Sequence, residues 1–422
     1  MTRLIHLFWL LAVATASAHA RQEPLVMCDE ILRNGQGLAC TFTNACVQLG
    51  DDFEHHKIVV PYWASKPKKG AVPRFVQVHA RKWESMPSNR SRYGRIRVEF
   101  EPASSDIFQG RDWIKGANVV VEHTCWNYGH WLYDSLIPVH RLLRNKKLNR
   151  HEKTVSVWNL PERTEDTCTN YYEDGLLPGF AFLNMRVSKC FEKLVSGLSL
   201  DWGLEFQYHP GQYHGPDLKQ YRAFRDSAIS PQQRLEDAAN HDPKRAHKKR
   251  KLLFCDRLDN RQIRNKDELL SFLRRKLGSK WKIEKVLFDD MTQTEQALRI
   301  SDADVVLGFS GSNVLNAVYG KDDLRVIELL SNGMHNFHSN TFKKMPHLCH
   351  RVYRASFRET IFVPDGSRPI SNETFAELAV QEEDWKNLDS LYVWRKSSAI
   401  ELDLNRFWEA LGSFIIGRTC NH

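Results

Sequence analysis

The clearest alternation of apolar and polar positions runs from residue 252 to residue 330. Short, almost wholly apolar runs there are typical of buried strands, and between them apolar residues recur every three or four positions, as on one face of a helix. This alternation predicts the order β-α-β-α-β-α-β and therefore a parallel, doubly wound sheet. The predicted strands are 252–255, 281–288, 304–308 and 326–330, and the predicted helices are 266–277, 294–300 and 314–319.

The first half of the chain is patterned less clearly. Three β-type runs, 57–62, 75–79 and 95–101, are separated by turn residues and predict a small β-rich subdomain. A first, Rossmann-like α/β unit is predicted after it, from strands at 117–123, 155–158 and 182–189 and a helix from about residue 128 to 144.

A loop of small residues, Ser310-Gly311-Ser312-Asn313, follows the predicted strand 304–308. Small side chains let backbone N–H groups approach a ligand closely, and the N-terminus of the next helix adds partial positive charge. Open α/β sheets bind their ligands at the carboxyl ends of their strands. The loop therefore predicts a phosphate cradle, although the same pattern also occurs where a strand and a helix simply pack closely.

Arginines follow the first strand of the same predicted sheet. Arg257, Arg261 and Arg264 lie in a loop that ends at Asn265, an acceptable helix N-cap. Arginine binds phosphate oxygens in bidentate fashion, so two arginines beside the cradle suit a diphosphate. Glu328, on the strand after the cradle, is predicted to accept hydrogen bonds from ribose hydroxyls.

Taken in order, these motifs resemble glycosyltransferase family 61. The resemblance covers roughly residues 118–355 and implies a GT-B fold, with two Rossmann-like domains facing across a cleft, here with a small β-rich N-terminal portion. The residues that carry it are Arg257-x₃-Arg261-x₃-Asn265, Glu295-Gln296, Gly308-x₂-Gly311-Ser312-x₃-Asn316, Val326-Ile327-Glu328-Leu329 and Asn127-Tyr128-Gly129-His130, with Asp134 and Leu136 after it.

The resemblance implies an inverting transfer of a sugar from a UDP-sugar to a hydroxyl of a protein or glycan. GlcNAc is favoured as the sugar and xylose is an alternative. The chain departs from the family pattern at Ser310 and Asn313, where the family usually has histidine and glycine. The residues expected to bind the nucleotide sugar are Arg257, Arg261, Asn265, Ser310, Gly311, Ser312, Asn313, Asn316 and Glu328.

His130 and Asp134 are the predicted catalytic residues. They are four positions apart, so they share one face of the helix predicted there. An inverting transfer needs a base that takes the proton of the acceptor hydroxyl. A structural His–Asp pair within the helix, or a cap at its N-terminus, is an equally good interpretation.

A metal is not expected. Asp302-Ala303-Asp304 looks like the DxD metal motif of other glycosyltransferases, but it precedes a buried strand, where a polar cap fits better. Arginines and a helix N-terminus can stabilise a leaving diphosphate without a metal. The sequence thus predicts no cofactor besides the UDP-sugar donor.

The N-terminus and the cysteines indicate the secretory pathway. Residues 4–18 are nearly all apolar and end in an A-x-A site, which predicts a cleavable signal peptide over 1–20, with a Golgi type II anchor as the alternative. Nine cysteines suggest disulfides in an oxidising lumen of the endoplasmic reticulum or Golgi. The expectations are a local bridge among Cys28, Cys40 and Cys46, a Cys168–Cys190 bridge, a free Cys255, and glycosylation sequons at Asn89 and Asn372.

The net charge of +9 is concentrated in a basic stretch at 244–251. Behind a signal peptide this stretch is interpreted as a solvated linker, so no nucleic-acid partner is predicted. No segment after the signal is apolar enough for a stable membrane span. The expected partners are a UDP-sugar donor and a protein or glycan acceptor.

The predicted organisation follows from these boundaries. A signal peptide (1–20) and a β-rich subdomain (21–115) precede a first Rossmann-like, acceptor-side domain (116–228). A basic linker (229–250), a nucleotide-sugar-binding Rossmann-like domain (251–360) and a C-terminal segment that packs back on the domains (361–422) complete the chain.

Two alternatives remain at this stage. Ser310 lies in a strand-to-helix turn that approaches the G-x-S-x-G elbow of serine hydrolases, but Ser312 replaces the last glycine. The loss of the family histidine at Ser310 also suits an inactive luminal glycan-binding protein. UDP binding separates the hypotheses, because the transferase should bind UDP and the hydrolase should not.

Overall fold

The four strands predicted between residues 252 and 330 form a parallel sheet in the computed structural model of the chain, in the order β14-β13-β15-β16-β17. The predicted alternation of strands and helices is confirmed, and a fifth strand, β17, extends the sheet. The elements are β13 (Arg250–Cys255), α7 (Lys266–Leu277), β14 (Trp281–Val286), α8 (Gln293–Ser301), β15 (Val305–Phe309), α9 (Ser312–Leu315), the 3₁₀ turn η9 (Asn316–Tyr319), β16 (Leu324–Leu330) and β17 (Leu348–Arg354).

The chain divides into two compact units. The first unit takes its described residues from 26–122, 138–160 and 180–198, and the second from 129–137 and 218–417. The structure describes residues 26–33, 35–51, 55–62, 66–68, 70–78, 95–122, 129, 131–146, 155–160, 180–198, 218–229, 249–258, 261–332, 334, 341–342, 345, 347–362 and 398–417.

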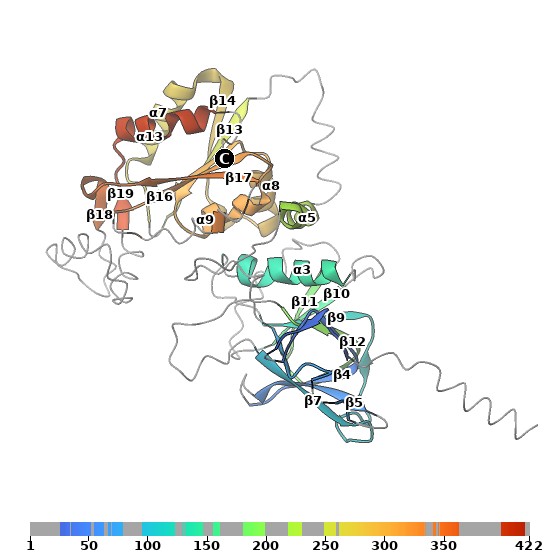
Figure 1. Ribbon diagram of the computed structural model, residues 1–422. Helices are drawn as coiled ribbons and strands as arrows, with labels where there is room; N and C mark the ends of the chain where they lie inside the picture. The colour runs from blue at the N-terminus through green and yellow to red at the C-terminus, as the bar shows by residue number, and fades with distance from the viewer. Residues whose placement is uncertain are drawn as a thin grey trace, which may run out of the picture. The chain divides into compact units, whose positions relative to one another are not determined.

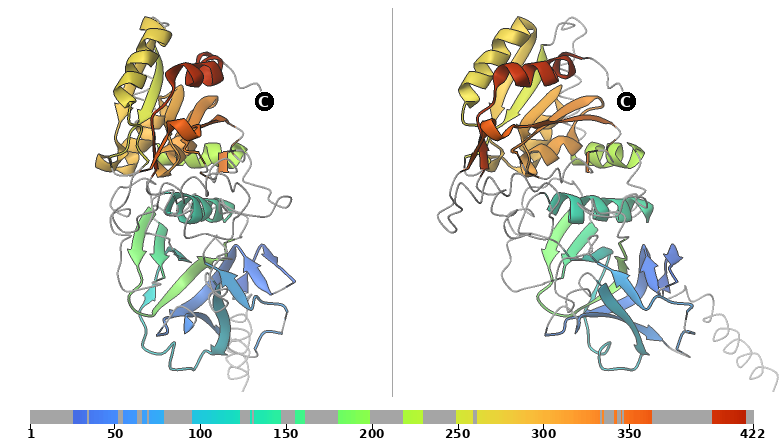
Figure 2. Two further views of the ribbon diagram at one scale, coloured as in Figure 1. Left: turned by 90° about the vertical axis from the view of Figure 1, so that its left-hand side faces the viewer. Right: turned by 60° about the vertical axis from the view of Figure 1, so that its left-hand side comes forward.

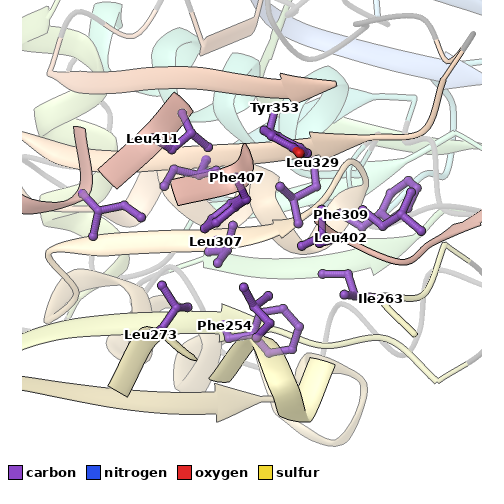
Figure 3. Packing of buried hydrophobic residues seen from close by; sticks show 14 of the residues in the cluster. Phe254, Ile263, Leu273, Leu307, Phe309, Leu329, Tyr353, Leu402, Phe407 and Leu411 are labelled. Atoms are coloured by element: carbon purple, nitrogen blue, oxygen red, sulfur yellow. The ribbon is translucent and has the colours of Figure 1, made fainter. Parts of the chain in front are cut away.

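Helices cover both faces of the five-stranded sheet in the second unit (Figure 1). The helices α7 and α13 (Leu404–Ile416) lie on one face, and α8 and α9 lie on the other, as both views of Figure 2 show. The face under α7 and α13 holds the main hydrophobic core, with Phe254, Leu307, Leu329 and Phe407 among its buried side chains (Figure 3). The C-terminal residues 398–417 are thus part of this unit's core.

A twelve-stranded sheet fills the first unit, in the order β11-β10-β9-β12-β4-β5-β7-β6-β3-β2, and in addition β1 pairs with β4 and β8 with β12. Its strands come from both sides of residue 115, so the boundary predicted there does not divide the sheet. The mixed α/β class is confirmed. The elements are β1 (Val26–Met27), β2 (Glu30–Ile31), β3 (Gln36–Leu38), β4 (Cys40–Gln48), β5 (Lys57–Tyr62), β6 (Phe75–Gln77), β7 (Arg95–Pro102), β8 (Trp113–Ile114), β9 (Ala117–Val121), α3 (Ile137–Asn145), β10 (Val155–Asn159), β11 (Phe180–Asn184) and β12 (Lys189–Ser196).

Disulfides join strands of the first unit. The predicted local bridge is Cys28–Cys40, but Cys190 bonds Cys46 rather than Cys168. The reason is strand pairing, since Cys190 on β12 lies directly opposite Cys46 on β4. In the second unit Cys255 is a free, buried thiol, as predicted, and burial raises its pKa.

Several expectations lie outside the described residues. They are the signal peptide, the linker residues 230–248 and the sequons at Asn89 and Asn372. Across the part of the chain that the structure describes, no helix combines the length and apolarity needed to cross a bilayer.

The buried carboxylate of Glu359 fastens the C-terminal helix to the sheet. It accepts hydrogen bonds from Tyr353 Oη at 2.6 Å, from Ser356 N and Oγ at 2.7 and 2.8 Å, and from Asp403 N at 2.9 Å, and it pairs with Arg406. Burial alone would raise the pKa of Glu359, but the hydrogen bonds from Tyr353, Ser356 and Asp403 outweigh it and lower the pKa below its usual value.

Glu359→Gln should therefore lower the free energy of unfolding at neutral pH by about 2–4 kcal/mol. A carboxyl group whose pKa is lowered by folding stabilises the fold fully when the pH is above its unfolded-state pKa of about 4.3. This stabilisation is lost as the pH falls through the lower folded-state pKa. The free energies of unfolding of the wild type and the variant, measured with urea, should differ at pH about 7 and converge as the pH falls below about 4. A difference that is the same at both pH values contradicts this assignment, and Glu401→Gln, an exposed neighbour, is the control.

Candidate functional site

The strand order places a topological switch point between β13 and β15. In the chain β14 follows β13 on one side, and β15 then returns to the other side of β13. In doubly wound sheets with this order, the loops after the two central strands leave toward opposite faces and ligands bind between them. The carboxyl ends of β13 and β15 lie side by side, with Cys255 opposite Gly308.

The two predicted arginines and the predicted small-residue loop meet at this point. A Cβ atom placed on Gly311 would lie 2.6 Å from Nη1 of Arg257 and 3.2 Å from Nη1 of Arg261. Nη1 of Arg261 also donates a hydrogen bond of 3.0 Å to the carbonyl oxygen of Ser310. Two guanidinium groups thus converge on a residue without a side chain.

Arg261 has an unusual backbone conformation, with φ of +52°. This left-handed region is strained for residues other than glycine, at a cost on the order of 1 kcal/mol, and persists only where surrounding contacts enforce it. Strained backbone of this kind clusters at functional sites.

The loop of small residues is hydrogen-bonded to β16 and to the residue that follows β13. The backbone N–H of Ser310 donates to the carbonyl of Leu329 at 2.9 Å, and Nδ2 of Asn313 donates to the carbonyl of Asp256 at 3.1 Å. Ser310 is only 1% exposed, a poor placement for the nucleophile of a hydrolase, which must reach its substrate.

The helix after the loop is shorter than predicted. It begins at Ser312 and consists of the single α turn of α9, followed by the 3₁₀ turn η9. A macrodipole needs several aligned α turns, so this helix supplies little positive charge. The charge at the crevice comes from Arg257 and Arg261.

Asp256 is a site residue that the sequence motifs did not reveal. It directly follows β13 and is 5% exposed. Its carboxylate accepts from the Arg257 N–H at 2.9 Å and from Lys266 Nζ at 2.8 Å, and Lys285 Nζ lies 3.8 Å away. Because two lysines balance its charge, the carboxylate need not repel an anion held by the arginines. The sequence feature that could have revealed Asp256 is its place as a charged residue directly after a buried strand.

Three predicted ligand contacts have structural roles instead. Asn265 precedes α7 as predicted but makes no capping bond, because its amide group bonds the backbone of Leu402. Asn316 is buried and donates to Oε1 of Gln296 at 2.8 Å. Gln296 on α8 in turn donates to the carbonyl groups of Phe288 and Met291 before the helix, so this pair joins α8 to η9.

Glu328 is the third of these residues. Its side chain is fully buried in β16, and Oε2 lies 3.1 Å from Nε2 of His350 on β17. A carboxylate without exposed surface does not reach a ligand in the crevice, so the predicted ribose contact does not fit its position.

The predicted catalytic pair is described only in part. His130 lies outside the described residues, and Asp134 lies in a π-helical turn, η3 (Trp131–Leu136), where only its backbone is described. The turn packs in the second unit, where Trp131 Nε1 donates to Oε1 of Gln293 at 3.3 Å and Tyr133 Oη donates to the carbonyl of Leu315.

The aspartates of the DxD-like triplet lie at the opposite edge of the sheet. Asp304 precedes β15, accepts from the Lys251 N–H at 2.7 Å and pairs with Lys321 Nζ at 2.8 Å, while Asp302 lies 3.5 Å from Lys251 Nζ. This agrees with a polar cap. Within the described residues, no group of three or more His, Cys, Asp or Glu side chains is placed to hold a metal ion.

The second unit is therefore a doubly wound α/β domain with two arginine side chains at its switch point. Residues 128–327 match the family model described as Glycosyltransferase 61, and this match supports membership of glycosyltransferase family 61. The match spans the π-helical turn, the arginine loop and the small-residue loop. Membership of this family indicates a glycosyltransferase. No curated protein matches the chain.

Proposed function

We propose that the protein is an inverting glycosyltransferase that moves a sugar, GlcNAc in preference to xylose, from a UDP-sugar to a hydroxyl of a protein or glycan. The observation that carries the proposal is the convergence of Arg257 and Arg261 on Gly311 at the switch point. Two guanidinium groups match the charge and the fork geometry of a diphosphate. The glycine lets both guanidinium groups approach the loop closely, because a side chain there would collide with them.

The proposed chemistry uses this crevice for the leaving group. Sugar transfer leaves negative charge on the β-phosphate of UDP, and fixed guanidinium groups stabilise that charge as it develops. The base for the acceptor hydroxyl would come from the family segment that contains His130 and Asp134. We keep the GT-B arrangement of two domains across a cleft as part of the proposal.

The secretory pathway is the proposed location, in the lumen of the endoplasmic reticulum or Golgi. Two disulfides in the first unit support it, because disulfides persist in oxidising compartments. The apolar N-terminal run and its A-x-A site support the same route.

A screen of UDP, UDP-GlcNAc and UDP-xylose for thermal stabilisation tests the proposal. A ligand present at about 100 times its Kd stabilises the folded protein by about 2.7 kcal/mol, so the true donor should raise the melting temperature measurably. UDP-GlcNAc is expected to give the largest rise. If no uridine nucleotide shifts the melting temperature, the proposal is wrong.

UDP binding should not require a metal ion, because arginines take the place of a cation at the diphosphate. The calorimetric affinity for UDP is expected to be the same in buffer with EDTA and in buffer with Mn²⁺. The variant Asp302→Ala should behave like the wild type in both. Binding that needs Mn²⁺ and is lost in Asp302→Ala would point to the DxD interpretation.

A further inference from the structure

The arginine loop, residues 256–265 between β13 and α7, is hydrogen-bonded at its C-terminal end to residue 400. The backbone N–H of Arg264 donates to the carbonyl of Ile400 at 2.8 Å, and the N–H of Ile400 donates to the carbonyl of Gln262 at 2.9 Å. Ile263 and Ile400 thereby form an isolated parallel bridge outside the five-stranded sheet. The loop is therefore held in register with residues near the C-terminus.

Asn265 completes this attachment with its side chain. Nδ2 donates to the carbonyl of Leu402 at 2.8 Å, and Oδ1 accepts from the N–H of Leu402 at 2.9 Å, across 137 positions of sequence. Ile263, Ile400 and Leu402 are buried in the core of the unit, and Figure 3 shows Ile263 and Leu402 near Phe309 at the end of β15. Four hydrogen bonds and a shared apolar core thus join the loop to residues 400–402.

The segment that holds the loop is itself held on two sides. It begins as β19 (Ser398–Ile400), which pairs with β18 (Thr360–Phe362), and Ser398 Oγ lies 3.0 Å from Ser331 Oγ after β16. It ends at Asp403, whose carboxylate caps α13. Because the segment is held by β18, Ser331 and α13, it fixes the position of the arginine loop relative to the core.

We propose that residues 398–402 form a positioning element for the nucleotide site and that Asn265 is its positioning residue. The strained backbone of Arg261 would relax without external restraint, because its left-handed φ is unfavourable for a residue with a side chain. The four bonds immediately after Arg261 supply that restraint and keep its guanidinium group over Gly311. The inference rests on the proposed binding of a diphosphate by Arg261.

The test compares the wild type with Asn265→Ala, Asn265→Asp and Asp304→Ala. Each protein is titrated calorimetrically with UDP, and hydrogen exchange of the backbone amides of residues 261–265 is followed. Asp304→Ala is the matched control, because it removes a bond of the same kind, from the Lys251 N–H at 2.7 Å, at the opposite edge of the sheet.

Asn265→Ala should weaken UDP binding about tenfold and speed exchange at Arg264, because the loop must then be ordered by the ligand. Asn265→Asp keeps the acceptor for the Leu402 N–H, so its UDP affinity and its exchange rate should lie between those of Asn265→Ala and the wild type. Asp304→Ala should bind UDP like the wild type. Unchanged exchange in Asn265→Ala, unchanged UDP affinity, or an equal loss of affinity in Asp304→Ala overturns the positioning role. A wild type that does not bind UDP overturns the proposed function first, and the positioning role with it.

Discussion

Replacing both Arg257 and Arg261 with alanine should weaken UDP binding by roughly 100- to 10,000-fold. A hydrogen bond to a charged group contributes on the order of 1.5–3 kcal/mol, and the variant removes at least one such bond at each position. Arg261→Ala alone should lose roughly 10- to 100-fold on the same basis. Two neighbouring arginines on one diphosphate share a partner, so their losses need not add.

Calorimetric titration with UDP and with uridine distinguishes lost phosphate contacts from a damaged fold. The double variant should keep the wild-type affinity for uridine, which has no phosphate. Arg264→Ala, which removes an exposed arginine from the same loop, and Lys249→Ala, before β13, are the matched controls and should bind UDP normally. Wild-type UDP affinity in the double variant would remove the arginines from the site.

Gly311→Ala should weaken UDP binding on the order of 100-fold while the fold persists. The added Cβ would lie 2.6 Å from Nη1 of Arg257, closer than real contacts allow, so this guanidinium must move away from the crevice. The end of an arginine side chain moves at little cost. The backbone of Gly311 is extended, with φ of 161°, so alanine fits it without strain.

Urea unfolding and UDP titration of the same Gly311→Ala preparation test this prediction together. The free energy of unfolding should stay within about 1 kcal/mol of the wild type, as for changes that only displace a flexible side chain. The uridine affinity should also be retained. A variant that binds UDP as tightly as the wild type would show that UDP binding does not need the Arg257 guanidinium beside Gly311.

The second unit could be predicted largely from local patterns. Its strands are apolar runs, and α7 buries Leu269, Leu270 and Leu273 at the spacing that the sequence displays. Because ligands bind at the carboxyl ends of parallel strands, the predicted parallel arrangement was enough to place Arg257 and the Gly311 loop at the same edge of the sheet. β17 was missed because His350 and Arg351 interrupt its apolar run.

The individual roles of polar residues depend on partners far away in sequence and could not be predicted. Asn265 looks like a helix cap or a ligand contact until Leu402 is placed beside it. Glu328 looks like a ribose acceptor until its burial against His350 is known. In the first unit the same limit applies to Cys190, whose partner Cys46 is set by the antiparallel pairing of β12 with β4.

The central claim is that Arg257 and Arg261 hold the diphosphate of a UDP-sugar at the switch point between β13 and β15. An experimental structure of the wild-type protein with UDP tests it most directly. We expect phosphate oxygens within hydrogen-bonding distance of both guanidinium groups. UDP bound elsewhere, or bound with its diphosphate away from both arginines, would contradict the claim.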